Sequence, residues 1–364
     1  MKVNSSTLNP EPERSSMLDF IPSVPAVEDA ELQQKVIARL NDLTKPQGSL
    51  GRLEDIALQY CMCRGRADAS IDKMKVFTFA GDHGITEERI TPFPGEVTQQ
   101  MVNNMAGGGA AVSVMCRNAN IDYAVVDIGV NADFNGAPGI ISRKAGRGTN
   151  NFSKEPAMSS GDCVRAVEVG MALGADAQAD LVGAGEMGIG NTSAASALYS
   201  MLLDCDPRDT VGPGTGSTGE LLEKKKRVVV SGVEKHKQEW DGTPFDALRR
   251  VGGYEIAGIT GLIFGCLSKK VPVVVDGFIS CAAALVAMRM DPKVRDYLFF
   301  AHASAETFHT AYLEKEHIRP ILSLDLRLGE GTGAVLAMQI IKQATACYNE
   351  MATFSAAGVS RKIT

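Results

Sequence analysis

The strongest constraint on the fold is an alternation of short apolar segments with helical segments along most of the chain. Five apolar segments have the length and composition of buried strands, at 75–81, 123–130, 179–186, 271–277 and 297–302. Helical periodicity occupies about 95–117, 160–177, 191–204, 218–238, 254–268, 278–290, 304–316 and 333–348. Apolar strands separated by helices form parallel sheets that are covered on both faces. The pattern therefore predicts an α/β fold with one parallel sheet between helical layers.

The segment before the first strand has a different character. Residues 27–43 and 50–63 each have the periodicity of an amphipathic helix, and the loop TKPQGS joins them with no strand between. We predict a small helical domain from residues 26–66 and 333–350, and a large α/β domain from residues 67–332. Because the first residues are rich in Pro, Ser and Glu, we expect residues 1–25 to form a flexible extension.

Composition excludes several classes of protein. The net charge of −6 argues against a nucleic-acid partner, and the apolar segments are too short to span a membrane. The N-terminus lacks the apolar core of a secretion signal. The eight cysteines include no C-x-x-C pair, which favours reduced thiols and a cytoplasmic location. The five histidines do not have zinc-ligand spacing, so we expect no metal site.

Glycine and polar residues collect where the predicted strands end. These positions are Gly81-Asp82-His83-Gly84, Gly185-Glu186, Asp276-Gly277 and His302. Sites in open parallel sheets form beyond the carboxyl ends of the strands. The sequence therefore predicts one shared active site at this edge of the sheet.

A glycine signature follows the third strand. Gly183, Gly185 and Gly188 fit G-x-G-x-x-G, which is typical of a dinucleotide site. Such a site also needs a second strand that ends in an acid, and residues 204–220 (DCDPRDTVGPGTGSTGE) contain none. The glycines therefore either place backbone amides against a single phosphate or form a tight turn with no ligand. Glu186 would repel a pyrophosphate and suits sugar hydroxyls or a developing positive charge.

A second glycine turn, GPGTG at 212–216, leads into a helix with three consecutive lysines, Lys224, Lys225 and Lys226. Neighbours on a helix point about 100° apart, so the three cannot share one ligand. Either one lysine reaches a phosphate, or all of them belong to a solvated helix face.

Glu330 lies between two glycines, just before an apolar helix. Partial burial of its carboxyl group would raise its pKa toward the range that suits a general base. The alternative is a helix-capping acid. Thr332 offers an equally good cap, so the acid is not needed for that purpose.

Eight motifs occur along the chain in an order that is shared with one known family of proteins. They are LTKPQGSLGRLE (43–54), AGDHGI (80–85), GEMGIGNTSAASAL (185–198), GPGTG (212–216), VGGYEIAGITG (251–261), VPVVVDGFIS (271–280), HASAE (302–306) and LDLRLGEGTGAVLAM (324–338). Over about residues 27–348 the chain resembles the nicotinate-nucleotide:dimethylbenzimidazole phosphoribosyltransferases of cobamide assembly. The resemblance implies a Rossmann-like large domain, a small helical domain from both chain ends, and a homodimer.

The resemblance also implies a reaction and its residues. Phosphoribose would move from nicotinate mononucleotide to 5,6-dimethylbenzimidazole with inversion at the anomeric carbon, giving α-ribazole 5′-phosphate and nicotinate without metal or cofactor. Glu330 matches the catalytic base, and Glu186 matches a second acid near the ribose. The remaining matches to substrate-binding positions are Gly188, Lys226, Ser304, Gly214 and Asp276.

Two positions of the expected base pocket depart from the family pattern. Phe93 replaces a serine and Met101 replaces a glutamine, and both changes make the pocket more apolar. We expect an aromatic base whose identity stays open. Phe308-His309 replaces Gly-His, and His309 either shapes the site or is structural.

Two other functions compete with this interpretation. An NAD-dependent oxidoreductase would rest on the glycine signature, and the missing second strand counts against it. A nucleotide-binding protein without catalysis would not need both Glu186 and Glu330.

Overall fold

The computed structural model describes residues 21–360 and has a six-stranded parallel sheet at its centre. Its strands are β1 (Met74–Gly81), β2 (Asp122–Gly129), β3 (Ile140–Ser142), β4 (Leu181–Met187), β5 (Val273–Val275) and β6 (Leu298–Phe300). The order across the sheet is β3-β2-β1-β4-β5-β6, and every neighbouring pair is parallel. This is the doubly wound Rossmann order, so the predicted fold class is confirmed.

The direction of winding reverses between β1 and β4, because the chain adds β2 and β3 on one side of β1 and β4 to β6 on the other. Loops that leave the two central strands diverge at such a point and open a crevice at the carboxyl edge. The topology therefore places the ends of β1, β4 and β5 around one potential site.

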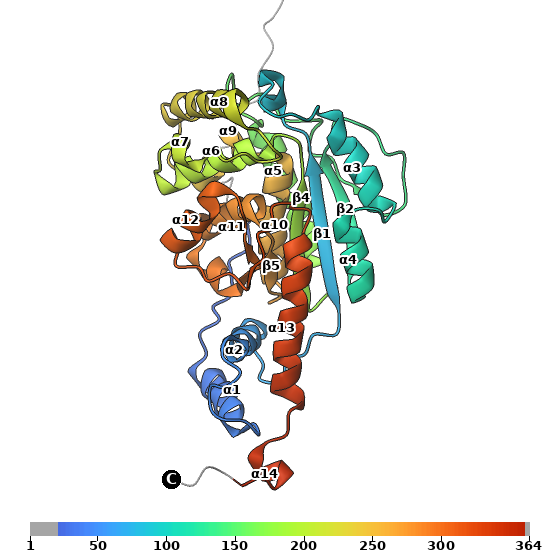
Figure 1. Cartoon of the computed structure of the whole chain (residues 1–364), viewed down its shortest axis with the longest axis vertical. Coiled ribbons are helices and arrows are strands. Elements are labelled where there is room, and N and C mark those ends of the chain that lie inside the picture. Colours follow the sequence, from blue (N-terminus) through green and yellow to red (C-terminus); the bar gives the residue numbers. More distant parts are fainter. Residues whose placement is uncertain (1–20, 361–364) are drawn as a thin grey trace, which may run out of the picture.

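Helices cover both faces of this sheet (Figure 1). One face packs against α5 (Ser160–Ala175), α10 (Tyr254–Leu267) and α11 (Phe278–Met290), and the other against α3 (Glu96–Ala106), α4 (Ala111–Ala119) and α13 (Thr332–Glu350). Along β1, Phe77 and Phe79 join the first apolar cluster, whereas Val76 and Ala80 join the second. Because successive side chains point to opposite faces and both faces are buried, the sequence of such a strand is apolar at nearly every position.

Helices α5 and α10 cross at very close range through glycines. A Cβ atom added to Gly170 would lie 1.9 Å from the Gly258 carbonyl oxygen, and one added to Gly261 would lie 1.9 Å from the Val167 carbonyl oxygen. No side chain fits at either position, so the two backbones set the spacing of this layer.

We expect Gly170→Ala to destabilise the protein by about 3 kcal/mol or more, because the added methyl group forces the two helices apart. Gly161→Ala is the matched control on the same helix, since a Cβ there meets no atom within 4 Å. Urea unfolding followed by circular dichroism measures both changes. A Gly170→Ala protein as stable as the control would contradict the close crossing.

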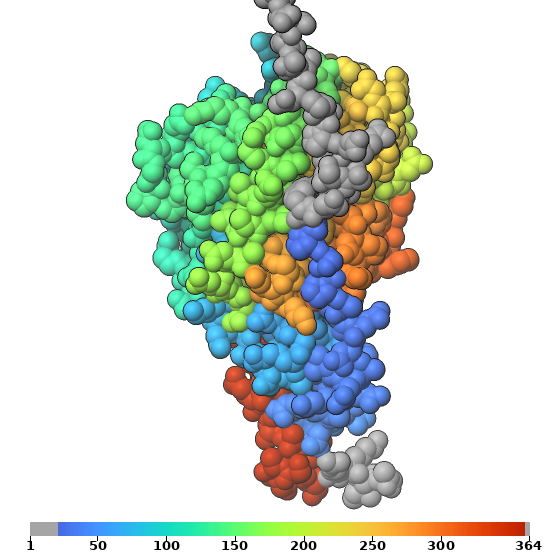
Figure 2. Space-filling view, turned by 180° about the vertical axis from the view of Figure 1, so that it is seen from behind, coloured from blue at the N-terminus to red at the C-terminus, as the bar shows by residue number. Residues whose placement is uncertain are grey.

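The two ends of the described chain meet beside the sheet. Helices α1 (Ala30–Asp42) and α2 (Arg52–Arg64) lie next to the C-terminal half of α13 at one end of the molecule (Figures 1 and 2). Leu43 forms an antiparallel bridge with Thr353, and the Arg39 Nε donates to the Tyr348 carbonyl oxygen at 2.9 Å. These contacts support the proposed small helical domain, whose boundaries stay a prediction. Most of the predicted extension at 1–25 lies outside the described residues.

The structure also differs from the expected elements. The helix predicted at 95–117 is wrong as one element, because Gly107 and Gly108 end α3 and α4 begins at Ala111. Three further helices lie where helices were expected: α6 (Asn191–Leu203), α8 (Gly219–Lys237) and α12 (Thr307–Lys315). Elements that the sequence did not indicate are β3, β7 (His302–Ala303), β8 (Leu322–Ser323), α7 (Pro207–Thr210), α9 (Pro244–Val251) and α14 (Phe354–Ala357). Within residues 21–360, no helix is both long enough and apolar enough to cross a membrane.

Candidate active site

A cleft opens at the carboxyl edge of the sheet, where the sequence predicts a site. Its walls come from the end of β4, the start of α6, the 212–216 turn, the end of β5, β7 and the loop before α13. The predicted residues among its lining are Glu186, Gly188, Gly214 and Ser304; the others include Asn191, Thr192, His302, Glu306 and Arg327. Motifs more than a hundred residues apart therefore share one cleft.

Glu186 is a buried acid in this cleft. It is the second-last residue of β4 and is 5% exposed, and Asn191 Nδ2 donates a hydrogen bond to its carboxylate. Burial, followed by the nearby carboxylates of Glu255 and Asp276, raises its pKa to about 8. Near neutral pH the side chain is mainly protonated, so in the free protein it offers a hydrogen-bond donor as well as an acceptor.

Glu186 should make the stability of the protein depend on pH. Its pKa is higher in the folded state, so the folded protein holds a proton that the unfolded chain releases above about pH 4.5. The free energy of unfolding should therefore be lower at neutral pH than at pH 5. Glu186→Gln should remove this pH-dependent decrease, which amounts to up to about 3 kcal/mol at pH 7. Urea unfolding between pH 5 and 8 measures the difference. Glu168→Gln, an exposed acid on α5, is the control, and equal profiles for the two variants would contradict the assignment.

Only one of the three signature glycines faces the cleft. Gly185 lets the loop before α13 approach, because a Cβ there would lie 2.3 Å from the Glu330 carbonyl oxygen. Gly183 packs against Met338 and Val76. Gly188 lines the cleft, and a Cβ on it would lie 2.4 Å from the Gly81 carbonyl oxygen. The dinucleotide interpretation therefore loses two of its three glycines, and α7 follows α6 where a second strand would be needed.

Lys225 lies directly behind the wall of the cleft. Its buried Nζ donates to Thr192 Oγ1 and to the Gly212 carbonyl oxygen, both at 2.9 Å. Lys226 turns away and pairs with Glu223 at 3.0 Å on the outer face of α8. Of the two lysines, Lys225 therefore lies toward the cleft and Lys226 toward the surface, and a phosphate contact of Lys226 stays a prediction. Burial lowers the pKa of Lys225 to about 8.

Ser304 is held in place by His309. The Ser304 N–H donates to His309 Nδ1 at 2.8 Å, and the Ser304 Oγ accepts from the Glu306 N–H at 3.3 Å. Burial lowers the pKa of His309 to about 3, so this imidazole stays neutral and accepts the bond. His309 thus shapes the site by fixing the segment that carries Ser304.

The loop that carries Glu330 has an unusual backbone. Gly329, Glu330 and Gly331 all have positive φ angles, of 82°, 66° and 101°. A non-glycine residue in this region costs free energy and is held there by its surroundings. Thr78 Oγ1 donates to the Glu330 carbonyl oxygen at 2.6 Å, and the Glu330 N–H donates to the Glu186 carbonyl oxygen at 3.2 Å.

Asp276 clamps the same loop. Its carboxylate accepts from the Gly331 N–H at 3.0 Å and from the Ala334 N–H at 2.9 Å. The side chain is 1% exposed, and Asp276 is not among the residues that line the cleft. Asp276 therefore faces the loop of Glu330, and its expected contact with a substrate stays a prediction.

The Glu330 carboxyl group is not among the groups that line the cleft. The residue is 4% exposed, and the carboxylate faces the backbone N–H of Val112 near the start of α4. Burial raises its pKa, which the Val112 N–H partly offsets, and the negative charge of Asp276 adds to the rise. A proton acceptor with a raised pKa in a dry setting is suited to general-base chemistry.

The two departures from the family pattern lie apart from this cleft. Phe93 is 45% exposed in a segment tied to the glycine turn, where Ser217 Oγ donates to the Ile90 carbonyl oxygen at 2.9 Å. Met101 lies on α3 and packs against the same apolar cluster as α4 and α13. The contact of both residues with a base stays a prediction.

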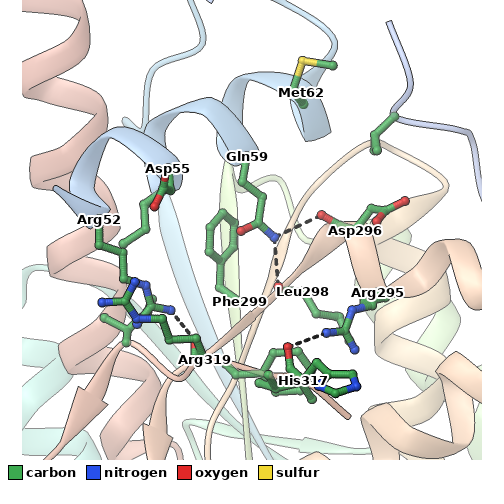
Figure 3. Close-up of a pocket in the computed structure, with 15 residues that line it drawn as sticks. Arg52, Asp55, Gln59, Met62, Arg295, Asp296, Leu298, Phe299, His317 and Arg319 are labelled. Carbon is green, nitrogen blue, oxygen red and sulfur yellow. Dashed lines mark hydrogen bonds between the residues drawn. The ribbon is translucent and has the colours of Figure 1, made fainter. Parts of the chain in front are cut away.

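A separate cavity of about 330 Å³ lies between α2 and the edge strand β6 (Figure 3). Its polar groups hold α2 against the sheet: Gln59 Nε2 donates to the carbonyl oxygens of Asp296 and Leu298 at 3.1 Å, and Arg52 donates to those of Arg319 and Pro320. This cavity shares no lining residue with the cleft that contains Glu186.

Comparisons with known proteins identify the family of this chain. A family model described as Phosphoribosyltransferase matches residues 26–359. A protein named nicotinate-nucleotide–dimethylbenzimidazole phosphoribosyltransferase from Chlorobaculum parvum is 51% identical over 92% of this chain and 95% of its own length. One of the same name from Pelodictyon phaeoclathratiforme is 52% identical over 89% of this chain and 92% of its own length. The crystal structure of CobT from Thermus thermophilus has a TM-score of 0.87 at 39% identity and covers 91% of this chain and 100% of that chain. The chain therefore belongs to this phosphoribosyltransferase family.

Proposed function

We propose that this chain transfers phosphoribose from nicotinate mononucleotide to 5,6-dimethylbenzimidazole or a related aromatic base, with nicotinate and α-ribazole 5′-phosphate as products. The observation that carries the proposal is the pair of buried acids, Glu186 and Glu330, joined through one strained loop at the carboxyl edge of the sheet. The names of relatives about 50% identical over most of the chain support the choice of substrates.

The nucleotide takes the cleft. Its phosphate lies among Gly188, Gly214, Ser304 and the ammonium group of Lys225, which together supply backbone amides, a hydroxyl group and a positive charge. Glu186 lies deeper in the same cleft and faces the ribose. This arrangement leaves the anomeric carbon directed toward the loop that carries Glu330.

Glu330 acts on the incoming base as the proton acceptor. One ring nitrogen of the base attacks the anomeric carbon, and the bond from that carbon to the nicotinate nitrogen breaks with its electron pair going to nicotinate. Glu330 accepts the proton from the second ring nitrogen, which removes the positive charge that develops on the attacking ring. Attack from the face opposite to the leaving group inverts the anomeric carbon from β to α.

The direct test is to incubate the purified protein with nicotinate mononucleotide and dimethylbenzimidazole and to analyse the products by chromatography. We expect α-ribazole 5′-phosphate and nicotinate in equal amounts. Consumption of the nucleotide without α-ribazole 5′-phosphate, or no reaction at all, would overturn the proposal. We further propose that the chain works as a cytoplasmic homodimer, which sedimentation of the purified protein tests for the oligomer.

Phe93 and Met101 lead to an expected preference among bases. Both side chains are apolar, so they should favour dimethylbenzimidazole over bases that need hydrogen-bond partners. We expect the highest kcat/KM for dimethylbenzimidazole in a comparison with 5-hydroxybenzimidazole, adenine and p-cresol. A clear preference for adenine would contradict an apolar base pocket.

A further inference from the structure

Glu306 places a carboxylate inside the pocket that the proposed function assigns to a phosphate. It lines the same cleft as Gly188, Gly214 and Ser304, and it is 6% exposed. Its Oε2 accepts a long hydrogen bond of 3.4 Å from the Gly214 N–H. A Cβ on Gly212 would lie 2.4 Å from the same oxygen, so the glycine turn is shaped around this acid. The cleft thus holds a buried carboxyl group where an anion has to bind.

The surrounding cations do not neutralise Glu306 by direct contact. Lys225 directs its Nζ to Thr192 and Gly212, and within residues 21–360 no ion pair of 4 Å or less joins it to Glu306. Burial raises the pKa of Glu306, and the charges of Lys225 and Arg327 act against the rise. A phosphate dianion entering beside an ionised carboxylate would meet repulsion that a buried site does not screen.

We propose that Glu306 takes up a proton when the phosphate group enters and then donates a hydrogen bond to a phosphate oxygen. The inference rests on the proposed function, because it takes the phosphate to lie between Gly214 and Ser304. The proton comes from solvent or from a singly ionised phosphate, it ends on a Glu306 oxygen, and no covalent bond to carbon or phosphorus changes. The site therefore binds the phosphate together with one proton.

Other titratable groups face this position and have to be separated from Glu306. They are Lys225 from α8, Arg327 from the loop before α13, His309 from α12, His302 from β7 and Glu186 from β4. Lys225 also gains protons when an anion binds, since its pKa is about 8. All of these groups are present in both wild type and Glu306→Gln. Loss of the Glu306 charge lowers the pKa of Lys225, so the variant takes up more protons at Lys225, and a larger uptake by wild type therefore belongs to Glu306. Glutamine keeps a hydrogen-bond donor without a titrating proton.

Isothermal titration calorimetry in two buffers of different protonation enthalpy counts the protons taken up. We expect nicotinate mononucleotide at pH 7, without any base, to bind wild type with uptake of up to about one proton more than Glu306→Gln. The affinity of wild type should fall up to about tenfold for each pH unit above pH 7 relative to that of the variant. Glu314→Gln, an exposed acid on α12, should behave as wild type. Nicotinate riboside, which lacks the phosphate, should bind wild type and variant alike and confirms that the variant is folded.

The outcomes separate this inference from the proposed function. If nicotinate mononucleotide does not bind wild type, the proposed function is wrong. Sulfate, a dianion that does not titrate near pH 7, is then the probe for Glu306 itself. Equal proton uptake by wild type and Glu306→Gln overturns the inference. If Glu306→Gln and Glu306→Ala both fail to fold, binding of sulfate to wild type without proton uptake overturns it as well.

Discussion

Glu330→Gln should bind nicotinate mononucleotide as wild type does and turn it over roughly 10²–10⁴ times more slowly, the usual effect of losing a general base. The amide preserves the size of the side chain, and the hydrogen bonds that hold the loop come from the backbone at residues 330, 331 and 334 and from Thr78 and Asp276. The loop should therefore keep its conformation while losing its proton acceptor. Single-turnover kinetics with excess enzyme separate binding from chemistry.

Asp325→Asn is the matched control for Glu330→Gln. It removes a carboxylate from the same loop at an exposed position, and asparagine accepts the positive φ of 54° there as well as aspartate does. Its turnover should stay within about twofold of wild type. A Glu330→Gln enzyme with the turnover of this control would rule out proton transfer to Glu330.

Lys225→Met should raise the Kd for nicotinate mononucleotide roughly 30- to 1,000-fold, corresponding to about 2–4 kcal/mol for a buried cation that contacts a phosphate. The methionine side chain fills a similar volume, so the loss should come from the charge. Binding of nicotinate riboside should change little, because the riboside lacks the phosphate group. Equilibrium binding by calorimetry measures both ligands.

Lys226→Met provides a comparison one residue away on the same helix. Its ammonium group pairs with Glu223 at the surface, and surface pairs contribute little to stability or binding. We expect a Kd within about twofold of wild type. The opposite ranking of the two variants would restore Lys226 as the phosphate-binding residue and contradict the orientation of α8.

Sequence patterns could predict the fold because the strand residues are apolar on both faces and the helices are long. The same patterns could not predict which lysine lies inside. Helical periodicity shows that Lys225 and Lys226 point in different directions, but it does not show which of them faces inward. The decisive signal is tertiary: the Lys225 position packs toward Thr192 and Gly212, which lie elsewhere in the chain.

Two other features of the site could not be predicted for the same reason, since they also depend on contacts between distant segments. Gly183 and Gly185 fit a phosphate motif in sequence, but in three dimensions they make room for Met338 and for the loop of Glu330. The position of Asp276 at a strand end suggests a ligand contact, yet its partners are backbone amides that follow it by more than fifty residues. Local sequence identifies residues that approach the site, whereas contacts between distant segments decide what each of them touches.

Helix α13 links the chemistry to the far end of the molecule. It begins at Thr332, two residues after Glu330, and its 19 residues span about 28 Å to the place where Arg39 and Leu43 contact the C-terminal segment. A helix of this length transmits a tilt with little bending. A displacement of α1 and α2 relative to the sheet would therefore tilt α13 and shift the loop that carries Glu330 at its other end.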